Sequence, residues 1–304
     1  MATYRIEPNK DTLHGFFSRD LAPVLTIDSG DTIHFKTIDA EWGLENFNVT
    51  LVDPKLGPPP RKTADTNPTG HALCGPVFIR GAEPGMTLAI HIDAIRTGTW
   101  GWTIGGKTSE GQVLHLWELD PDQLRGRNHL GHQIPLHPFM GVMGMPPAEA
   151  GQHSTNPPRV TGGNIDCKEL VAGTILYLPI AVQGGLFSTG DGHAAQGDGE
   201  VSRTAIECPM EDAALTFHLQ PDMTITTPRA WTPTCWLTFG FDESLNVAAQ
   251  TALEAMLDLM VEKRNVTRAD AKALASVVVD LRITQIANSV FGVHAVLAHD
   301  AWTA

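Results

Sequence analysis

The chain has 304 residues, 42% of them hydrophobic, and a formal net charge of -13, so it can bury one large core or two smaller ones. The negative charge disfavours binding to nucleic acid or anionic membranes, because both depend on basic patches. The sequence has no run of 18 apolar residues and no apolar signal-peptide core in its first residues. We therefore expect a cytoplasmic protein without membrane or nucleic-acid partners.

The 29 glycines and 21 prolines predict many turns between short strands. Residues 23–37 have the pattern of a β-hairpin, with apolar strands on either side of the turn D-S-G-D. Residues 76–92 repeat this pattern around E-P-G, and further strands are predicted at 214–219 and 235–240. Residues 54–72, rich in proline and polar residues, predict a long loop that could border a binding site.

Helices are predicted only near the C-terminus. Residues 243–263 carry apolar side chains at spacings of three and four, which is typical of a helix packed on a sheet. Thr267 resembles an N-cap that opens a second helix through Val279. The predicted fold is mainly β, with a β-sandwich or barrel core and a smaller C-terminal α+β unit. We assign 1–160 to an N-terminal β-rich domain, and 161–304 to the central motif, further strands and the α+β portion, packed as one compact unit.

Residues 161–207 concentrate polar groups between glycines. Asp191 and His193 lie two residues apart, and so do Asp198 and Glu200, so each pair faces one side of an extended segment. Asp166 would join them from the preceding segment. Carboxylate and imidazole ligands without thiolate suit Zn²⁺, which we favour, or Fe²⁺ or Mn²⁺, and a carboxylate-dominated set suits Ca²⁺. The alternative is that these residues only form turns.

In a metal site of this kind, Asp166, Asp191 and His193 are the predicted ligands, and Asp198 is an alternative ligand or an orienting residue. Glu200 is the predicted general acid/base, because a carboxylate near an activated water can take its proton and return it to nitrogen. The division between ligand and base stays open at this point. Asn164 could donate to a developing oxyanion or hold the glycine turn.

The chain resembles the acetamidase/formamidase family of metal-dependent amidases over nearly its whole length. Four motifs carry the resemblance: G-P-V-F-I-R-G-A-E-P-G at 75–85, H-P-F-M-G-V-M-G at 137–144, G-G-N-I-D-C-K-E-L at 162–170 and L-F-S-T-G-D-G-H-A-A-Q-G-D-G-E-V at 186–201. The resemblance implies hydrolysis of a short aliphatic amide, formamide or acetamide, to a carboxylate and ammonia, in a homo-oligomer. It also implies that His14 reaches the site. Lys168, next to Asp166, is a separate candidate that could stabilise negative charge on the substrate.

Two other readings use the same residues. Cys167, Lys168 and Glu169 are the residue types of a nitrilase-like amidase, but neighbouring side chains on a strand point to opposite faces. The chain could instead be a β-sandwich binding protein stabilised by Ca²⁺, or an inactive scaffold.

The four cysteines form no C-x-x-C pair, which favours reduced, buried thiols.

Overall fold

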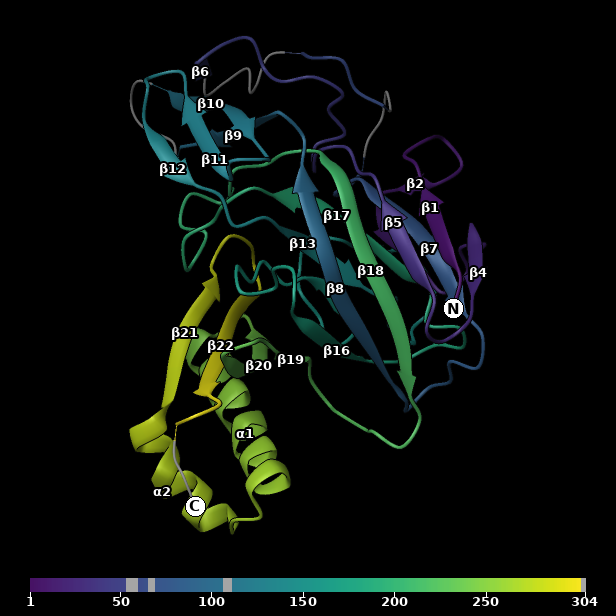
Figure 1. Ribbon diagram of the computed structural model, residues 1–304, viewed down its shortest axis with the longest axis vertical. Coiled ribbons are helices and arrows are strands. Elements are labelled where there is room, and N and C mark those ends of the chain that lie inside the picture. The colour runs from purple at the N-terminus through teal and green to yellow at the C-terminus, as the bar shows by residue number, and fades with distance from the viewer. Residues whose placement is uncertain (53–59, 65–68, 106–110, 302–304) are drawn as a thin grey trace.

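The computed structural model describes residues 1–52, 60–64, 69–105 and 111–301, and Figure 1 shows its arrangement. The largest sheet has nine strands, all antiparallel to their neighbours except the first pair. In spatial order they are β1 (Thr3–Ile6), β5 (Thr32–Phe35), β18 (Met210–Gln220), β8 (Thr87–Thr97), β16 (Ile175–Pro179), β19 (Arg229–Trp231), β20 (Cys235–Asp242), β22 (Phe291–Ala298) and β21 (Val279–Gln285).

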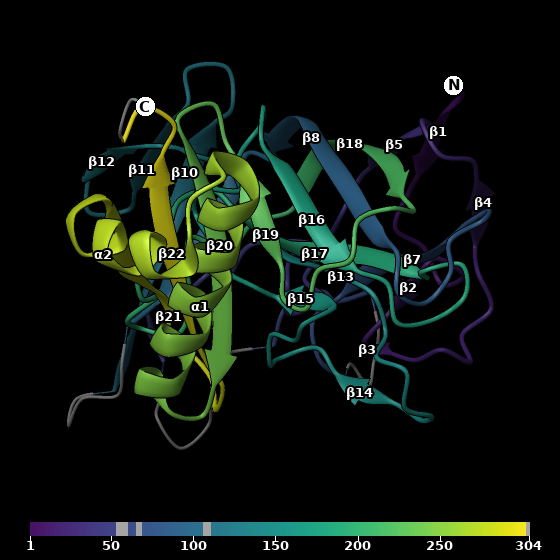
Figure 2. The same cartoon turned by 90° about the horizontal axis from the view of Figure 1, so that it is seen from below.

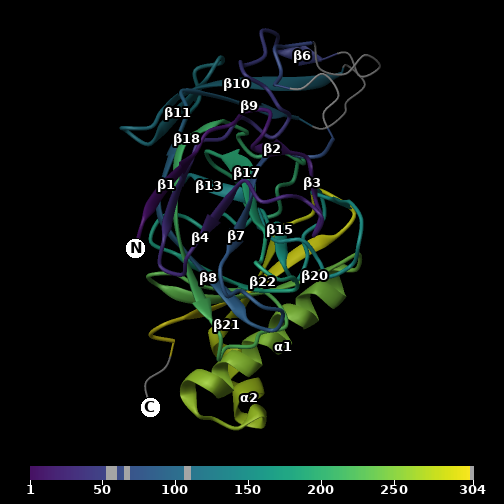
Figure 3. The ribbon, with the colours of Figure 1, turned by 90° about the vertical axis from the view of Figure 1, so that its right-hand side faces the viewer.

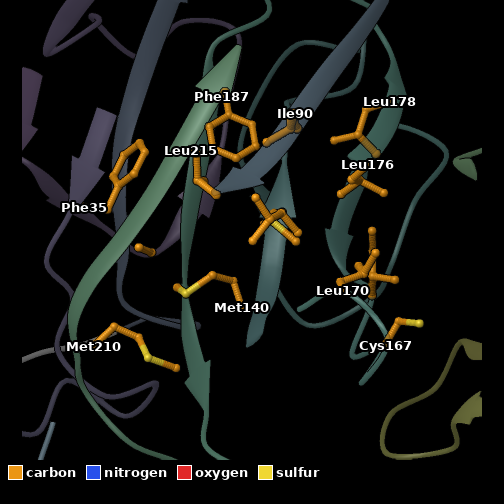
Figure 4. Close-up of a cluster of buried hydrophobic side chains, with 14 of the residues drawn as sticks. Phe35, Ile90, Met140, Cys167, Leu170, Leu176, Leu178, Phe187, Met210 and Leu215 are labelled. Atoms are coloured by element: carbon orange, nitrogen blue, oxygen red, sulfur yellow. The ribbon is translucent and has the colours of Figure 1, made fainter. Parts of the chain in front are cut away.

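A second sheet of six strands carries most of the glycine-rich motif. In order these are β15 (Gly162–Asn164), β13 (Phe139–Gly144), β17 (Phe187–His193), β7 (Leu73–Ile79) and β2 (Leu13–His14), with β4 (Leu25–Ile27) also paired to β7. One buried apolar cluster joins the two sheets. It includes Phe35, Ile90 and Leu215 from the nine-stranded sheet and Met140 and Phe187 from the six-stranded sheet, as Figure 4 shows. This shared core confirms the predicted mainly β fold.

Two smaller sheets complete the β structure of the described residues. One contains β12 (Gln133–Pro135), β11 (Arg125–Asn128), β10 (Gln112–Asp120), β6 (Leu51–Val52) and β9 (Trp100–Ile104); the other pairs β14 (His153–Ser154) with β3 (Phe16–Phe17). The first lies at the end of the molecule opposite the helices (Figure 3). Its apolar cluster includes Trp102, which also reaches the cavity described below.

The C-terminal unit confirms both predicted helices. They are α1 (Leu245–Arg264) and α2 (Arg268–Val278), and the Thr267 side chain accepts a hydrogen bond from the Asp270 amide, as predicted for an N-cap. Helix α1 packs on β20 and β22 (Figure 2). A Cβ on Gly240 would lie 2.0 Å from the Ala248 carbonyl oxygen, so the close approach of helix and strand requires glycine. Within the described residues, neither helix is long and apolar enough to cross a membrane.

Strand pairing crosses the predicted boundary at residue 160. Strand β8 pairs with β18 and β16, and β13 pairs with β17 and β15. The division into 1–160 and 161–304 stays a prediction. For the site, the important pairing is β13 with β17, because it sets Phe139 opposite His193. The two rings meet edge to face, with centroids 5.1 Å apart.

Candidate functional site

A buried cluster of four carboxylates surrounds the His193 imidazole. Its Nε2 atom lies 3.2 Å from Asp191 Oδ1 and 3.3 Å from Glu207 Oε2, and its Nδ1 atom lies 4.0 Å from Asp166 Oδ1. Possible ligand atoms of Asp166, Asp191 and His193 lie within 4.8 Å of one another, and so do those of His193, Glu200 and Glu207. All five residues are buried. The structure therefore brings together four residues predicted from the sequence and adds Glu207.

Three of these carboxylates sit on backbone with a positive φ. The angle is 53° at Asp166, 59° at Asp191 and 44° at Glu200. Such conformations cost a residue other than glycine about 1–3 kcal/mol each, and they concentrate at functional sites. Neighbouring elements hold the strained segments: the Gln196 side chain donates to the Asp166 carbonyl at 2.7 Å, and the Gly199 amide donates to the Thr284 carbonyl of β21 at 3.2 Å.

Glu207 reaches the cluster through bridges to two strands that are distant in sequence. It forms isolated β-bridges with His193 and with Trp102. The Ala205 amide donates to Glu207 Oε1 at 2.9 Å, which leaves Oε2 facing His193. Sequence reasoning missed Glu207 because it follows the glycine-rich run, in a segment with no polar spacing pattern of its own.

Burial and mutual repulsion perturb the titration of the cluster. Burial raises the pKa of Asp166 well above its usual range, and the nearby Glu200 carboxylate raises it further. Burial also raises the pKa of Glu200 to about 7 and that of Glu207 to about 8. For His193 the effect of burial is outweighed by Glu207 and Asp191, which raise its pKa well above 6.5. One imidazolium cannot balance four carboxylates, so the cluster favours protons or an added cation.

The cluster passes two structural tests for a divalent cation. First, both Asp166 carboxylate oxygens, His193 Nδ1 and Glu207 Oε2 are buried without a hydrogen-bond partner among the described residues. Second, a Cβ on Gly141 would lie 2.6 Å from Asp191 Oδ2, 2.8 Å from Asp166 Oδ1 and 2.9 Å from His193 Cε1. Glycine at 141 thus keeps clear a space that three candidate ligands face. Carboxylate and imidazole groups of this kind fit Zn²⁺, Fe²⁺ or Mn²⁺.

The cluster forms one wall of a small cavity of about 170 Å³. Asp191, His193, Glu200 and Glu207 line it, together with Asn164, His71, Trp102 and other residues. Pockets for drug-sized ligands occupy about 300–1,000 Å³, so this cavity suits a ligand of a few heavy atoms. A larger groove of about 830 Å³ runs beside α1, but none of the cluster residues lines it.

Two of the predicted catalytic residues lie differently with respect to this cavity. Asn164, on β15, lines the cavity, and its Oδ1 atom is buried without a hydrogen-bond partner in the part of the chain that the structure describes. His14, on β2, is not among the lining residues. Its Nε2 lies 2.9 Å from Ser188 Oγ and its Nδ1 lies 2.8 Å from the Phe16 carbonyl oxygen.

Lys168 and Asp198 lie outside the cluster. The Lys168 ammonium pairs with Asp198 Oδ1 at 2.9 Å, and the two side chains are 33% and 38% exposed. Asp198 and Glu200, which the sequence spacing predicted to face one side, are therefore separated: Asp198 lies at the surface and Glu200 lies in the cluster. Of the predicted loop 54–72, residues 54–59 and 65–68 lie outside the described residues, but His71 at its end does line the cavity.

Cys167, Lys168 and Glu169 do not converge in the way a nitrilase-like centre requires. The Cys167 thiol donates to Glu169 Oε2 at 3.2 Å, whereas Lys168 turns to Asp198. Burial raises the pKa of Cys167 well above 9.0, and the Glu169 charge adds to this. A thiol that stays protonated is a poor nucleophile.

The sequence model of the Acetamidase/Formamidase family matches residues 148–297, which contain all five cluster residues. A solved structure of acetamidase from Bacillus halodurans has a TM-score of 0.84 to this chain and 26% sequence identity, covering 97% of each chain. The chain belongs to the acetamidase/formamidase family. Membership confirms the resemblance drawn from the four sequence motifs.

Other family proteins agree with this result. A formamidase from Methylophilus methylotrophus is 50% identical over an alignment that covers 62% of this chain and 60% of that protein. An acetamidase structure from Yersinia enterocolitica has a TM-score of 0.86 at 23% identity, covering 99% of this chain and 93% of that one, and so supports the fold. The chain spans about 60% of the length of the curated formamidases it matches.

Proposed function

We propose that this protein hydrolyses a short aliphatic amide, formamide or acetamide, to a carboxylate and ammonia with the help of a divalent metal ion. The observation that carries the proposal is the buried carboxylate–imidazole cluster on the wall of a cavity of about 170 Å³. A cavity of this size restricts the substrate to a few heavy atoms. The names of the related formamidase and acetamidases support the same reaction class.

Asp166, Asp191 and His193 would hold the metal, and Zn²⁺ is the ion we favour, with Fe²⁺, Mn²⁺ and Ca²⁺ as alternatives. When bound, such an ion lowers the pKa of water and polarises a carbonyl group. The donor set supports this choice, because imidazole suits Zn²⁺, Fe²⁺ and Mn²⁺ better than it suits Ca²⁺.

The remaining polar groups of the cavity supply proton transfer and orientation. Glu200 would take a proton from the attacking water and return it to the departing nitrogen, so that the amide C–N bond breaks and ammonia leaves. Glu207 faces the same histidine and is a second candidate for this transfer. The Asn164 amide lines the cavity and would hydrogen-bond the substrate amide.

His14 and the Lys168–Asp198 pair would not contact the substrate and would act through other residues. His14 contacts Ser188 on β17, the strand that carries Asp191 and His193. We propose that His14 positions this strand. The ion pair links the loop after Asp166 to the loop that carries Glu200, and we propose a structural role for it.

The direct test measures ammonia release from formamide and acetamide by purified, chelated and metal-resupplied protein, with metal content determined on each sample. We expect activity to disappear on chelation and to return with Zn²⁺. Asp191→Asn should abolish both metal binding and turnover, whereas Asp198→Asn, the matched control outside the cluster, should keep both. Activity that survives complete metal removal would refute the metal mechanism. Bound metal without turnover on either amide would favour a metal-stabilised binding protein.

The homo-oligomeric state, the cytoplasmic location and the absence of nucleic-acid and membrane partners stay predictions from the sequence. The formal charge of -13 supports the last of these. Sedimentation of the purified protein would measure the oligomeric state.

A further inference from the structure

A second group of possible metal ligands lies outside the site just described. It consists of Cys167, Glu169 and His294, whose candidate ligand atoms all lie within 4.8 Å of one another. Cys167 Sγ lies 3.2 Å from Glu169 Oε2, and His294 Nε2 lies 3.7 Å from the same oxygen. Cys167 and Glu169 follow β15 along the chain, whereas His294 is on β22 of the C-terminal unit. Figure 4 shows Cys167 next to Leu170 at the end of the apolar cluster.

The His294 imidazole is held with one nitrogen available. Its Nδ1 lies 2.8 Å from Thr284 Oγ1 on the adjacent strand β21. Its Nε2 is buried and has no hydrogen-bond partner among the residues described. If Nδ1–H donates to Thr284, the Nε2 lone pair faces Cys167 and Glu169. This is the usual arrangement of a metal-binding histidine, whose second nitrogen donates to a nearby acceptor.

The charged neighbours of the group leave Glu169 Oε2 available to bind a cation. Arg282 Nη1 lies 3.2 Å from Glu169 Oε1, so the Arg282 cation occupies the oxygen that points away from the cysteine. The Lys168 ammonium is paired with Asp198. The Glu169 side chain is 18% exposed, so the group lies close to the protein surface.

A simple hydrogen-bonded network explains these contacts only in part. A thiol donating to Glu169 accounts for the 3.2 Å contact. It leaves His294 Nε2 at 3.7 Å from Glu169, too far for a hydrogen bond, and without another partner in the part of the chain that the structure describes. By contrast, ligand atoms sharing one tetrahedral Zn²⁺ are separated by about 3.3–3.6 Å, given Zn–S and Zn–N distances of roughly 2.3 and 2.0 Å. The Cys167 Sγ–Glu169 Oε2 separation of 3.2 Å is slightly shorter than this range, and the His294 Nε2–Glu169 Oε2 separation of 3.7 Å is slightly longer.

We propose that Cys167 Sγ, Glu169 Oε2 and His294 Nε2 form a second cation site, suited to Zn²⁺, with a water molecule as the fourth ligand. Binding would displace the thiol proton to solvent and replace the Cys167–Glu169 hydrogen bond with bonds to the ion. The site would join the segment that follows Asp166 to β22. It would therefore hold the segment after Asp166, a candidate ligand of the first site, in place against the C-terminal unit. Its role would be structural.

Cobalt provides a test that distinguishes the two sites, because a thiolate ligand gives Co²⁺ a near-ultraviolet charge-transfer band and the cluster around His193 has no thiolate. The full-length protein, freed of metal and kept reduced, is titrated with Co²⁺, and absorbance and bound cobalt are measured. We expect a saturable thiolate band. Cys167→Ser should lose the band together with one equivalent of cobalt, and His294→Gln should weaken cobalt binding at this site at least tenfold.

Two variants serve as controls. Cys235→Ser removes another buried thiol and should keep the band. Asp191→Asn should also keep the band but lose the equivalent of cobalt that binds at the cluster around His193. A wild-type protein without the band at saturating Co²⁺, or a band that survives Cys167→Ser, would overturn the second site. If Cys167→Ser does not fold, Glu169→Gln and His294→Gln carry the same test. The thiolate band reports cobalt bound at Cys167 and does not depend on amide hydrolysis. An inactive protein could therefore still show the band, and each proposal can be refuted without the other.

Discussion

His193 and Glu207 face each other across a single β-bridge, with His193 Nε2 3.3 Å from Glu207 Oε2. The other Glu207 oxygen is held by the Ala205 amide, so the carboxylate cannot turn away without losing that bond. Because Asp191 Oδ1 lies 3.2 Å from the same nitrogen, the imidazole is shared between two carboxylates. A residue at the very end of the stretch 161–207, beyond its last glycine, therefore completes the centre.

Replacement of Glu207 by glutamine should reduce kcat at least 100-fold on formamide. The change keeps the shape of the side chain but removes the charge that faces His193 and the ability to exchange a proton, and proton transfer by a positioned carboxylate contributes about 10²–10⁴-fold. Steady-state kinetics with metal analysis would measure it. Glu211→Gln, at an exposed position paired with Lys36, is the control. Unchanged turnover in Glu207→Gln would exclude Glu207 from the centre.

The space beside Gly141 provides a second test of the metal centre. Gly141→Ala would place a methyl group within 2.9 Å of atoms of Asp166, Asp191 and His193, so these side chains must move apart. We expect the variant to fold but to bind metal at least tenfold more weakly, as measured by competition with a chromophoric chelator. Gly197→Ala is the matched control, because a Cβ at that glycine would have no atom within 4 Å. Equal metal affinities in the two variants would contradict the assigned position of the ion.

Local patterns in the sequence predicted the positions of single strands and helices. The predicted hairpins at 23–37 and 76–92 were wrong, because β4 and β7 belong to the six-stranded sheet whereas β5 and β8 belong to the nine-stranded sheet. Periodicity located α1 and its N-capped neighbour α2, and the glycine-rich run located Asp191 and His193. Local patterns could not show which distant segments meet. Glu207 reaches His193 only through bridges to β17 and β9, and His294 reaches Cys167 because β22 lies beside β20. Asp198 had the expected spacing from Glu200, but its contact with Lys168 holds it at the surface.

A buried ion pair next to the cavity should contribute strongly to stability. Asp39 accepts hydrogen bonds from the Trp102 indole at 2.9 Å and from the Gly43 amide at 2.8 Å, and it pairs with Arg61 at 2.5 Å. Asp39→Asn removes the nearer and buried carboxylate partner of Arg61 and leaves only the exposed Glu41, 3.6 Å away. Loss of one partner of a buried pair typically costs about 3–5 kcal/mol. Urea unfolding at pH 7 would measure the loss. Asp222→Asn, at an exposed position, should change stability by under about 0.5 kcal/mol, and an equally small change for Asp39→Asn would contradict the argument.

His14 should make stability depend on pH below neutrality. Burial lowers the pKa of His14 to about 4 in the folded protein, against about 6.5 when unfolded. Between these values the unfolded chain binds a proton that the folded protein does not, so stability falls as the pH drops from about 6.5 to about 4. His14 alone should cost roughly 2 kcal/mol between pH 7 and pH 5. Glutamine can keep hydrogen bonds to Ser188 and the Phe16 carbonyl without titrating, so His14→Gln should remove that part of the difference in urea unfolding. His137→Gln, which removes an exposed ring, should keep the wild-type difference; if His14→Gln keeps it too, His14 takes up a proton equally well in the folded and unfolded states.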